Sequence, residues 1–181
     1  MNNRTESLLE KFSADTKSAV SLLYEKRLYT HLLIVIYSSI DTMGLLDAPL
    51  STISATGNTF KKWAKKYLIE GKDFEFNEVD LWGARCSVLH TLTSESDLSR
   101  ANKAREIQYF SGPKDSAMAK AFVSATREIG DGKNVPAHLD SLYLAFIESL
   151  NNFLLCDFLR KCKEDTNYEK RLDKVLQIFA L

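Results

Sequence analysis

The chain has 181 residues, which fits one domain over residues 1–181, and its apolar share of 45% is typical of a globular protein and not of a disordered one. Its 24 basic and 24 acidic residues cancel, which excludes attraction of the whole molecule to nucleic acid or to an anionic membrane. The three cysteines have no C-x-x-C spacing, which predicts a reduced protein without a disulfide framework or a zinc site. The N-terminus is polar, and the longest apolar run is only Leu32 to Tyr37, so neither a signal peptide nor a membrane span is expected. We therefore expect a cytoplasmic protein.

The first part of the chain is predicted to be helical. Apolar residues at helical spacing predict helices over Glu6–Tyr24, over Tyr29–Met43 with Gly44 as its stop signal, and over Thr59–Glu70 between a candidate cap, Asn58, and Gly71. The segment Leu32–Ile36 is apolar on nearly all sides, so the second helix is expected to be the most buried. A polar connection, Asp47–Gly57, precedes the third helix, and Asn77 or Asp80 opens the next one.

The second part is predicted to hold one irregular insertion, between residues 93 and 137. Within it, Thr93–Ser99 is a loop or the start of a short helix, and Arg105–Phe110 is a short strand or a helical turn. Next come a turn at residues 111–113, a helix over Met118–Ile129 and a loop that starts at Gly130 and contains Pro136. The chain is predicted to end with helices over Leu139–Lys163 and Tyr168–Phe179. The fold class expected is an all-α bundle of about five to seven helices.

The stretch from Asp80 to Thr93 places an arginine and a histidine five positions apart near the end of a helix with a buried stripe. Arg85 borders that stripe, and His90 follows it. A guanidinium and an imidazole beside a buried seam are costly unless they are paired or used. Five helical steps separate the two side chains by about 140° around the axis, so they converge only if the helix ends near His90 or if a second copy of the chain contributes.

Asp41 is the expected partner of Arg85. It lies at the end of the apolar second helix, where a carboxylate needs a partner, and a bidentate contact from Arg85 would supply one. The same contact could orient the arginine toward a phosphate. Cys86 is expected to be a small buried residue beside the pair. His31 and His138 have no neighbours at metal-ligand spacing, so we assign both a structural role, and we expect neither a metal nor a cofactor.

The predicted third helix carries four lysines, Lys61, Lys62, Lys65 and Lys66, at i, i+4 spacing. Such a face could follow the phosphates of a nucleic acid. The simpler interpretation is a solvated lysine face opposite the packing stripe.

Arg85-x-x-x-x-His90, near the end of a helix in a helical protein, resembles the hallmark R-x(4–6)-H of the HEPN superfamily. The contexts Ile40–Gly44, Phe60-x-x-Trp63 and Leu81–Cys86 are similar to those of an uncharacterised plasmid- and genome-encoded branch. The resemblance covers roughly residues 28–98. It implies a helical homodimer in which Arg85 and His90 of both chains form one metal-independent ribonuclease site, with RNA as substrate and a cognate antitoxin or other defence partner.

Two positions differ from that pattern. Cys86 stands where catalytic members commonly carry Asn, Asp or His, and Leu92 stands where some toxin members carry a modified tyrosine. Two alternatives therefore remain open. One is a non-catalytic interaction module in which Asp41 and Arg85 hold the helices together, and the other is a nucleotide-binding regulator that uses the same cleft.

Overall fold

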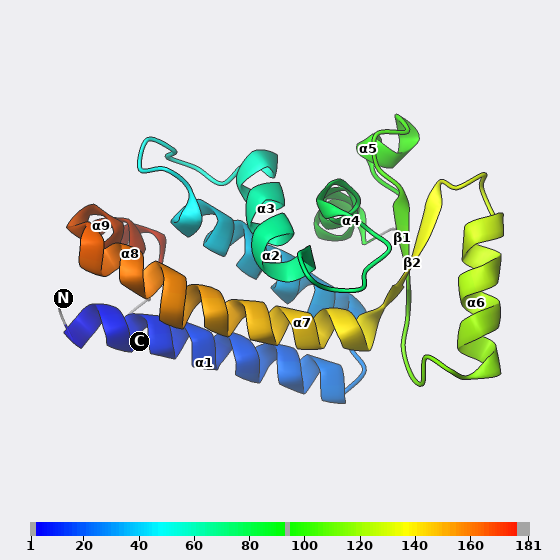
Figure 1. Cartoon of the computed structure of the whole chain (residues 1–181), viewed down its shortest axis with the longest axis horizontal. Helices are drawn as coiled ribbons and strands as arrows, with labels where there is room; N and C mark the ends of the chain where they lie inside the picture. Colours follow the sequence, from blue (N-terminus) through cyan, green and yellow to red (C-terminus); the bar gives the residue numbers. More distant parts are fainter. Residues whose placement is uncertain (1–2, 93–94, 177–181) are drawn as a thin grey trace.

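The computed structural model describes residues 3–92 and 95–176, and within them the prediction of an all-α fold is confirmed (Figure 1). The first half contains α1 (Asn3–Glu25), α2 (Tyr29–Asp47), α3 (Gly57–Trp63), the π-helix η1 (Ala64–Ile69) and α4 (Glu78–Thr91). The second half contains α5 (Asp97–Arg100), β1 (Glu106–Phe110), α6 (Ala117–Glu128), β2 (Asn134–His138), α7 (Leu139–Asn151), the π-helix η2 (Asn152–Phe158), α8 (Leu159–Glu164) and α9 (Thr166–Val175).

The long helices α1, α2 and α7 form the body of the molecule. Figure 1 shows α1 and α7 running antiparallel along the length of the protein, with α3 and α4 packed on the other side of α2. The segment predicted to be the most buried is central to this core, because Leu32, Ile36 and Ile40 of α2 are fully buried. Burying apolar side chains on several faces of one helix supplies the main stabilising term of the fold.

Gly44 does not end the second helix, as its sequence context had predicted. α2 continues to Asp47, and α3 packs against it at the glycine. A Cβ atom at position 44 would lie 2.7 Å from the backbone oxygen of Thr59, closer than any side chain tolerates. The glycine therefore serves a close approach of two helix backbones and not a helix stop.

The third helix begins two residues earlier than predicted, at Gly57 and not at Thr59. Its cap is Thr56 and not Asn58, since the Thr56 hydroxyl accepts a hydrogen bond from the amide of Thr59, whose side chain bonds back to Thr56. After Trp63 the helix widens into η1. Its i to i+5 bonding interrupts the i, i+4 alignment expected for the lysines. Gly71, with φ of +75°, follows the end of the helix as predicted.

The segment expected to be an irregular insertion contains ordered structure. The alternative of a strand holds for residues 106–110, because β1 pairs in parallel with β2, with Ile107 opposite Val135. α6 connects the two strands and packs on them at one end of the molecule (Figure 1). Pro136 was predicted to lie in a loop but lies within β2, where a two-stranded sheet leaves each strand an open edge that tolerates a missing N–H.

The predicted long C-terminal helix is confirmed as the continuous run of α7, η2 and α8 over residues 139–164. The last predicted helix is α9, and its predicted end at Phe179 lies outside the described residues. By length and composition alone, α2 and the run from Leu139 to Glu164 could span a membrane. About half of each apolar window, 50% and 44%, is buried within the fold, as in the core helices of globular proteins.

Candidate functional site

α4 carries the predicted motif, and its first turn is firmly anchored. The Asn77 side chain accepts hydrogen bonds from the amides of Val79 and Asp80 at 2.8 and 3.0 Å, and the Asp80 carboxylate accepts from the Asn77 amide. Both residues proposed as the opening of this helix therefore take part, Asn77 as the cap and Asp80 as the reciprocal acceptor. The helix ends at Leu92, whose backbone is left-handed with φ of +56°.

Arg85 and Asp41 form the predicted ion pair between α4 and α2. Nε and Nη2 of Arg85 donate to the same oxygen, Oδ2 of Asp41, at 2.9 and 2.7 Å. The side chains are 20% and 16% exposed, so the pair is mostly withdrawn from water but can be reached from it. Burial raises the pKa of Asp41 above its usual value, although the Arg85 guanidinium opposes that shift. The contact is a fork onto one oxygen and not the two-oxygen arrangement expected from the sequence.

Trp82 holds Arg85 from a second side. The guanidinium carbon lies 4.9 Å from the centre of the Trp82 ring, which is a favourable cation–π distance. The indole in turn packs against Phe60, at 5.2 Å between ring centres, and against the backbone of Gly57 at the start of α3, where a Cβ would lie 2.7 Å from the ring. The orientation of Arg85 is therefore fixed by α2, α3 and its own helix together.

His90 lies one and a half turns beyond Arg85 and is exposed. It borders a hollow of about 360 Å³ between the C-terminal part of α4 and the short helix α5, which packs beside it (Figure 1). The described lining also includes Trp82, Cys86, Ser87, Glu95, Ser96, Asp97, Leu98 and Arg100. A hollow of this size accommodates a nucleotide-sized group or several water molecules.

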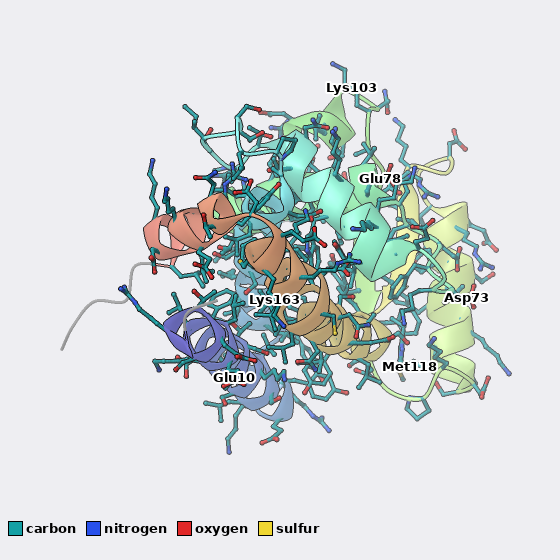
Figure 2. The ribbon with its side chains drawn as sticks, turned by 60° about the vertical axis from the view of Figure 1, so that its left-hand side comes forward. Glu10, Asp73, Glu78, Lys103, Met118 and Lys163 are labelled. Carbon is teal, nitrogen blue, oxygen red and sulfur yellow. The ribbon has the colours of Figure 1, made fainter. Side chains whose placement is uncertain are left out.

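The far wall of this hollow carries charges of both signs. Arg100 bonds to Glu95 at 3.3 Å and to Asp97, in both cases on the exposed surface of α5. The α5 helix is held by a reciprocal cap between Ser96 and Ser99. Lys103, just beyond it, lies at the outer edge of the molecule in Figure 2. The single-chain hollow is therefore of mixed charge and not a uniformly basic groove.

Cys86 connects the ion pair to the hollow. Its side chain is partly buried and lines the hollow, and the neighbouring Arg85 acts on its thiol. Burial raises the pKa of Cys86, whereas the positive charge of Arg85 lowers it and the negative charge of Asp41 raises it. Cys86 was expected to be a small buried residue, and the structure shows it only partly buried, because an open hollow lies between this turn of α4 and α5.

Within one chain, the predicted pair of Arg85 and His90 does not share one cavity. Arg85 turns toward α2, whereas His90 faces the hollow beside α5, and Arg85 is not among the described residues that line that hollow. Trp82 and Cys86 lie between the two environments, since each contacts Arg85 and lines the hollow. Of the two routes to convergence that the 140° separation left open, the first is a helix end near His90. It is present, yet the two side chains still face different environments. Convergence through a second copy of the chain stays a prediction.

The four lysines have different environments. Lys62 and Lys65 are exposed, and Lys61 is partly buried. Lys66 donates to the Tyr67 hydroxyl at 2.6 Å and lies 3.6 Å from Asp157 of η2. A nucleic-acid contact by this helix therefore remains a prediction that rests chiefly on Lys62 and Lys65.

Two contributors to the site were missed from the sequence. Arg105 donates through Nε and Nη2 to the buried Asp80, a pairing across 25 positions that no periodicity indicates. The wall formed by α5 has a recognisable signal, the Ser96-x-x-Ser99 cap. Among residues 3–92 and 95–176, no group of three or more His, Cys, Asp or Glu side chains is placed to hold a metal ion.

Comparison of the chain with family models, with curated proteins and with solved structures finds no match.

Proposed function

We propose that the chain is a HEPN-like, metal-independent endoribonuclease that acts as a homodimer, with Arg85 and His90 of both subunits at one composite site. The observation that carries the proposal is the arrangement on α4 of a guanidinium fixed by Asp41 and Trp82 and an exposed imidazole toward the helix end. A fixed cation and a mobile proton carrier are the two groups that RNA cleavage by its own 2′-hydroxyl requires.

The histidines would move the protons. One His90 accepts the proton of the ribose 2′-hydroxyl while the 2′-oxygen attacks the adjacent phosphorus. The His90 of the second subunit, protonated, gives its proton to the 5′-oxygen as the bond between phosphorus and that oxygen breaks. The products are a 2′,3′-cyclic phosphate and a 5′-hydroxyl. An imidazole titrates near neutral pH, which suits it to either role.

Arg85 would stabilise the negative charge that builds on the phosphoryl oxygens. A guanidinium is the cationic group best suited to phosphate oxygens, and one fifth of the Arg85 side chain is accessible. Because Asp41 and Trp82 hold it in advance, little reorganisation is needed when the charge develops. Asp41 is a positioning residue in this scheme, since it acts through Arg85.

The experiment is cleavage of a 5′-fluorescent single-stranded RNA in the presence of EDTA. We expect fragments that end in a 2′,3′-cyclic phosphate, and we expect His90→Ala to lower the rate by about 100-fold or more, the usual contribution of a general acid or base. His31→Ala is the matched control, because His31 is also exposed and lies on α2. Equal rates for His90→Ala and the unmodified chain would remove His90 from the mechanism.

Mixed dimers test the composite site. When unmodified and His90→Ala subunits are co-refolded, activity should follow the square of the unmodified fraction, because one histidine cannot be acid and base at once. A linear dependence, or a monomeric chain that cleaves RNA, would contradict the composite site.

The second candidate is a non-catalytic helical module in which Asp41 and Arg85 hold α2 to α4. The observation that favours it is the low exposure of this pair, 16% and 20%. It predicts that the purified dimer leaves RNA intact while loss of Arg85 weakens the fold. Cleavage that disappears in His90→Ala would reject it.

A further inference from the structure

A second cluster of chemically capable side chains lies where β2 runs into α7, away from α4. It consists of Gly112, His138, Asp140 and Ser141, and we name it the His138 cluster. His138 is the last residue of β2, and Asp140 and Ser141 lie in the first turn of α7. The sequence had suggested only a structural role for His138, but its ring is bonded at both nitrogens.

The hydrogen bonds determine where the ring proton lies. Nε2 of His138 is 2.7 Å from the carbonyl oxygen of Gly112, which can only accept, so Nε2 carries the hydrogen. In the neutral ring, Nδ1 is then an acceptor, and the Ser141 hydroxyl, 2.8 Å away, must donate to it. A serine that donates to a histidine lone pair is in the arrangement in which the histidine can remove its proton.

Asp140 and Gly112 hold the ring in this tautomer. Oδ2 of Asp140 accepts a hydrogen bond from the Gly112 amide at 2.9 Å, which holds the residue whose carbonyl binds the ring. The same oxygen lies 3.3 Å from Nε2 of His138 and so faces the ring hydrogen. The φ of Gly112 is +97°, a conformation that a side chain would strain. A carboxylate beside the far nitrogen also stabilises the imidazolium that forms when Nδ1 takes a proton.

Ser141 opens onto a hollow of about 190 Å³ between α6, β2 and the residues before α4. Its walls include the apolar side chains of Phe74, Phe110 and Val123, whereas Lys114 supplies a cation. Asp73, also in the lining, is labelled on the side of the molecule that carries α6 in Figure 2. Ser141, His138 and Lys114 thus border one small hollow with apolar and charged walls, and Asp140 lies behind the histidine.

We propose that the His138 cluster is a second catalytic site, in which Ser141 is a nucleophile that hydrolyses short-chain neutral esters. The Ser141 oxygen attacks the ester carbonyl and its proton passes to Nδ1 of His138. The bond from carbon to the alcohol oxygen then breaks, the alcohol leaves with that proton, and an acyl-serine remains. Water attacks the acyl carbon, again with His138 as base, and releases the carboxylic acid and the serine hydroxyl. Lys114 stabilises the oxyanion in both halves.

The hollow defines the substrate class. Its volume fits an acyl group of a few carbons, and the side chains of Phe74, Phe110 and Val123 form an apolar part of the wall for such a group. Asp73 and Glu75 in the lining disfavour a negatively charged ester. The site is separate from Arg85 and His90, so it stands whether or not the ribonuclease proposal holds.

The experiment is labelling of the full chain with an alkyl fluorophosphonate, which phosphonylates only activated serines, followed by intact and peptide mass spectrometry. We expect one adduct, located on Ser141, and hydrolysis of para-nitrophenyl acetate that labelling blocks. Ser141→Ala should abolish the adduct, and His138→Gln should slow labelling by about 100-fold. The control is Ser124→Ala, which should label normally, because Ser124 is an exposed serine of α6 that is bonded to Glu128.

Two results would overturn the proposal. One is an unlabelled chain, and the other is labelling that His138→Gln leaves unchanged; either would reduce the bond from Ser141 to His138 to a helix cap. If Ser141→Ala unfolds, the position of the adduct in the unmodified chain and the His138→Gln rate decide the question without it.

Discussion

α4 carries two ion pairs with neighbouring elements, and they are built differently. At its start, Asp80 is 3% exposed and accepts from the amides of Asn77 and Arg105 and from two nitrogens of the Arg105 side chain. Farther along, Asp41 accepts two bonds from Arg85, both on Oδ2, and each partner keeps 16–20% of its surface in water. Both oxygens of Asp80 are engaged, whereas the Asp41 pair concentrates its bonds on one oxygen and stays within reach of solvent.

The Asp80 carboxylate is enclosed by the fold, whereas both partners of the Arg85 pair can be reached from solvent. Asp80 accepts the Asn77 amide at the start of α4 and, through Arg105, connects that start to β1. All of its hydrogen bonds are therefore made within the fold. Arg85 is held as firmly, by Asp41 and Trp82, but part of its field reaches Cys86 and the hollow near His90. A guanidinium that is positioned and still accessible is the arrangement expected for a phosphate-binding group.

The largest effect on stability is expected from Asp80→Ala. The substitution removes the acceptor of two backbone amides and of the Arg105 side chain. The free energy of unfolding should fall by about 3 kcal/mol, the lower end of the range for a broken buried pair, because the Arg105 side chain is 38% exposed. Urea denaturation followed by circular dichroism measures it.

Glu78→Ala is the matched control for that substitution. Glu78 is an acid in the same first turn of α4, labelled in Figure 2, and its loss removes only an interaction with the helix dipole, about 0.3–1 kcal/mol. Equal costs for Asp80→Ala and Glu78→Ala would show that the bonds of Asp80 to Arg105 do not stabilise the fold.

Arg85→Ala is expected to cost less, about 2 kcal/mol at neutral pH, and its cost should depend on pH. Removing Arg85 removes the group that opposes the rise of the Asp41 pKa, so the buried carboxyl of the folded variant binds a proton more readily than that of the unfolded chain. Folding then takes up protons, and the variant gains stability as the pH falls through the raised pKa of Asp41. Urea denaturation at about pH 7 and about pH 5 should show the cost shrinking at the lower pH.

The double variant Asp41→Asn, Arg85→Ala shows whether Asp41 is the titrating group. Asparagine carries no charge at either pH, so the additional pH dependence should disappear. If it persists in the double variant, another carboxylate is responsible and the pairing of Arg85 with Asp41 is weaker than its geometry indicates.

The two pairs also mark how far the sequence predicts this fold. The pairing of Asp41 with Arg85 could be predicted because a buried charge needs a partner of opposite sign, and few charged residues lie within the apolar helices. The pairing of Asp80 with Arg105 could not, since it depends on how β1 docks against α4. The prediction for Gly44 was wrong for the same reason, because the sequence does not show which element packs against it. A glycine that ends a helix and a glycine that lets α3 approach closely have the same sequence pattern.

The region around β1 and β2 was the hardest to predict. The two five-residue strands are parallel and separated by α6. β1 alternates polar and apolar residues only over Glu106–Tyr109, which is too short to distinguish a strand from a helical turn, and β2 does not alternate. Pro136 argues against a strand unless its edge is known to be open. The hydrogen bonds of His138 are set by the same docking, which is why the sequence offered no signal for them.

The smallest expected effect is on the reactivity of Cys86. It tests the contrast between the two ion pairs locally, because Cys86 adjoins Arg85. The field of Arg85 lowers the Cys86 pKa against the effect of burial, so Arg85→Gln should raise that pKa and slow alkylation by iodoacetamide at mildly alkaline pH. Asp41→Asn should have the opposite effect, because the Asp41 charge raises the same pKa.

The other two cysteines provide internal references for this measurement by peptide mass spectrometry. Cys156 is exposed and should react at the same rate in every variant, whereas Cys162 is buried with a pKa of about 11 and should stay unmodified. If the ratio of Cys86 to Cys156 alkylation is the same in all variants, Asp41 neutralises Arg85 as completely as Asp80 is neutralised by Arg105. The pair of Asp41 and Arg85 would then be structural too, because a guanidinium whose field does not reach the adjacent thiol cannot stabilise negative charge on a bound phosphate.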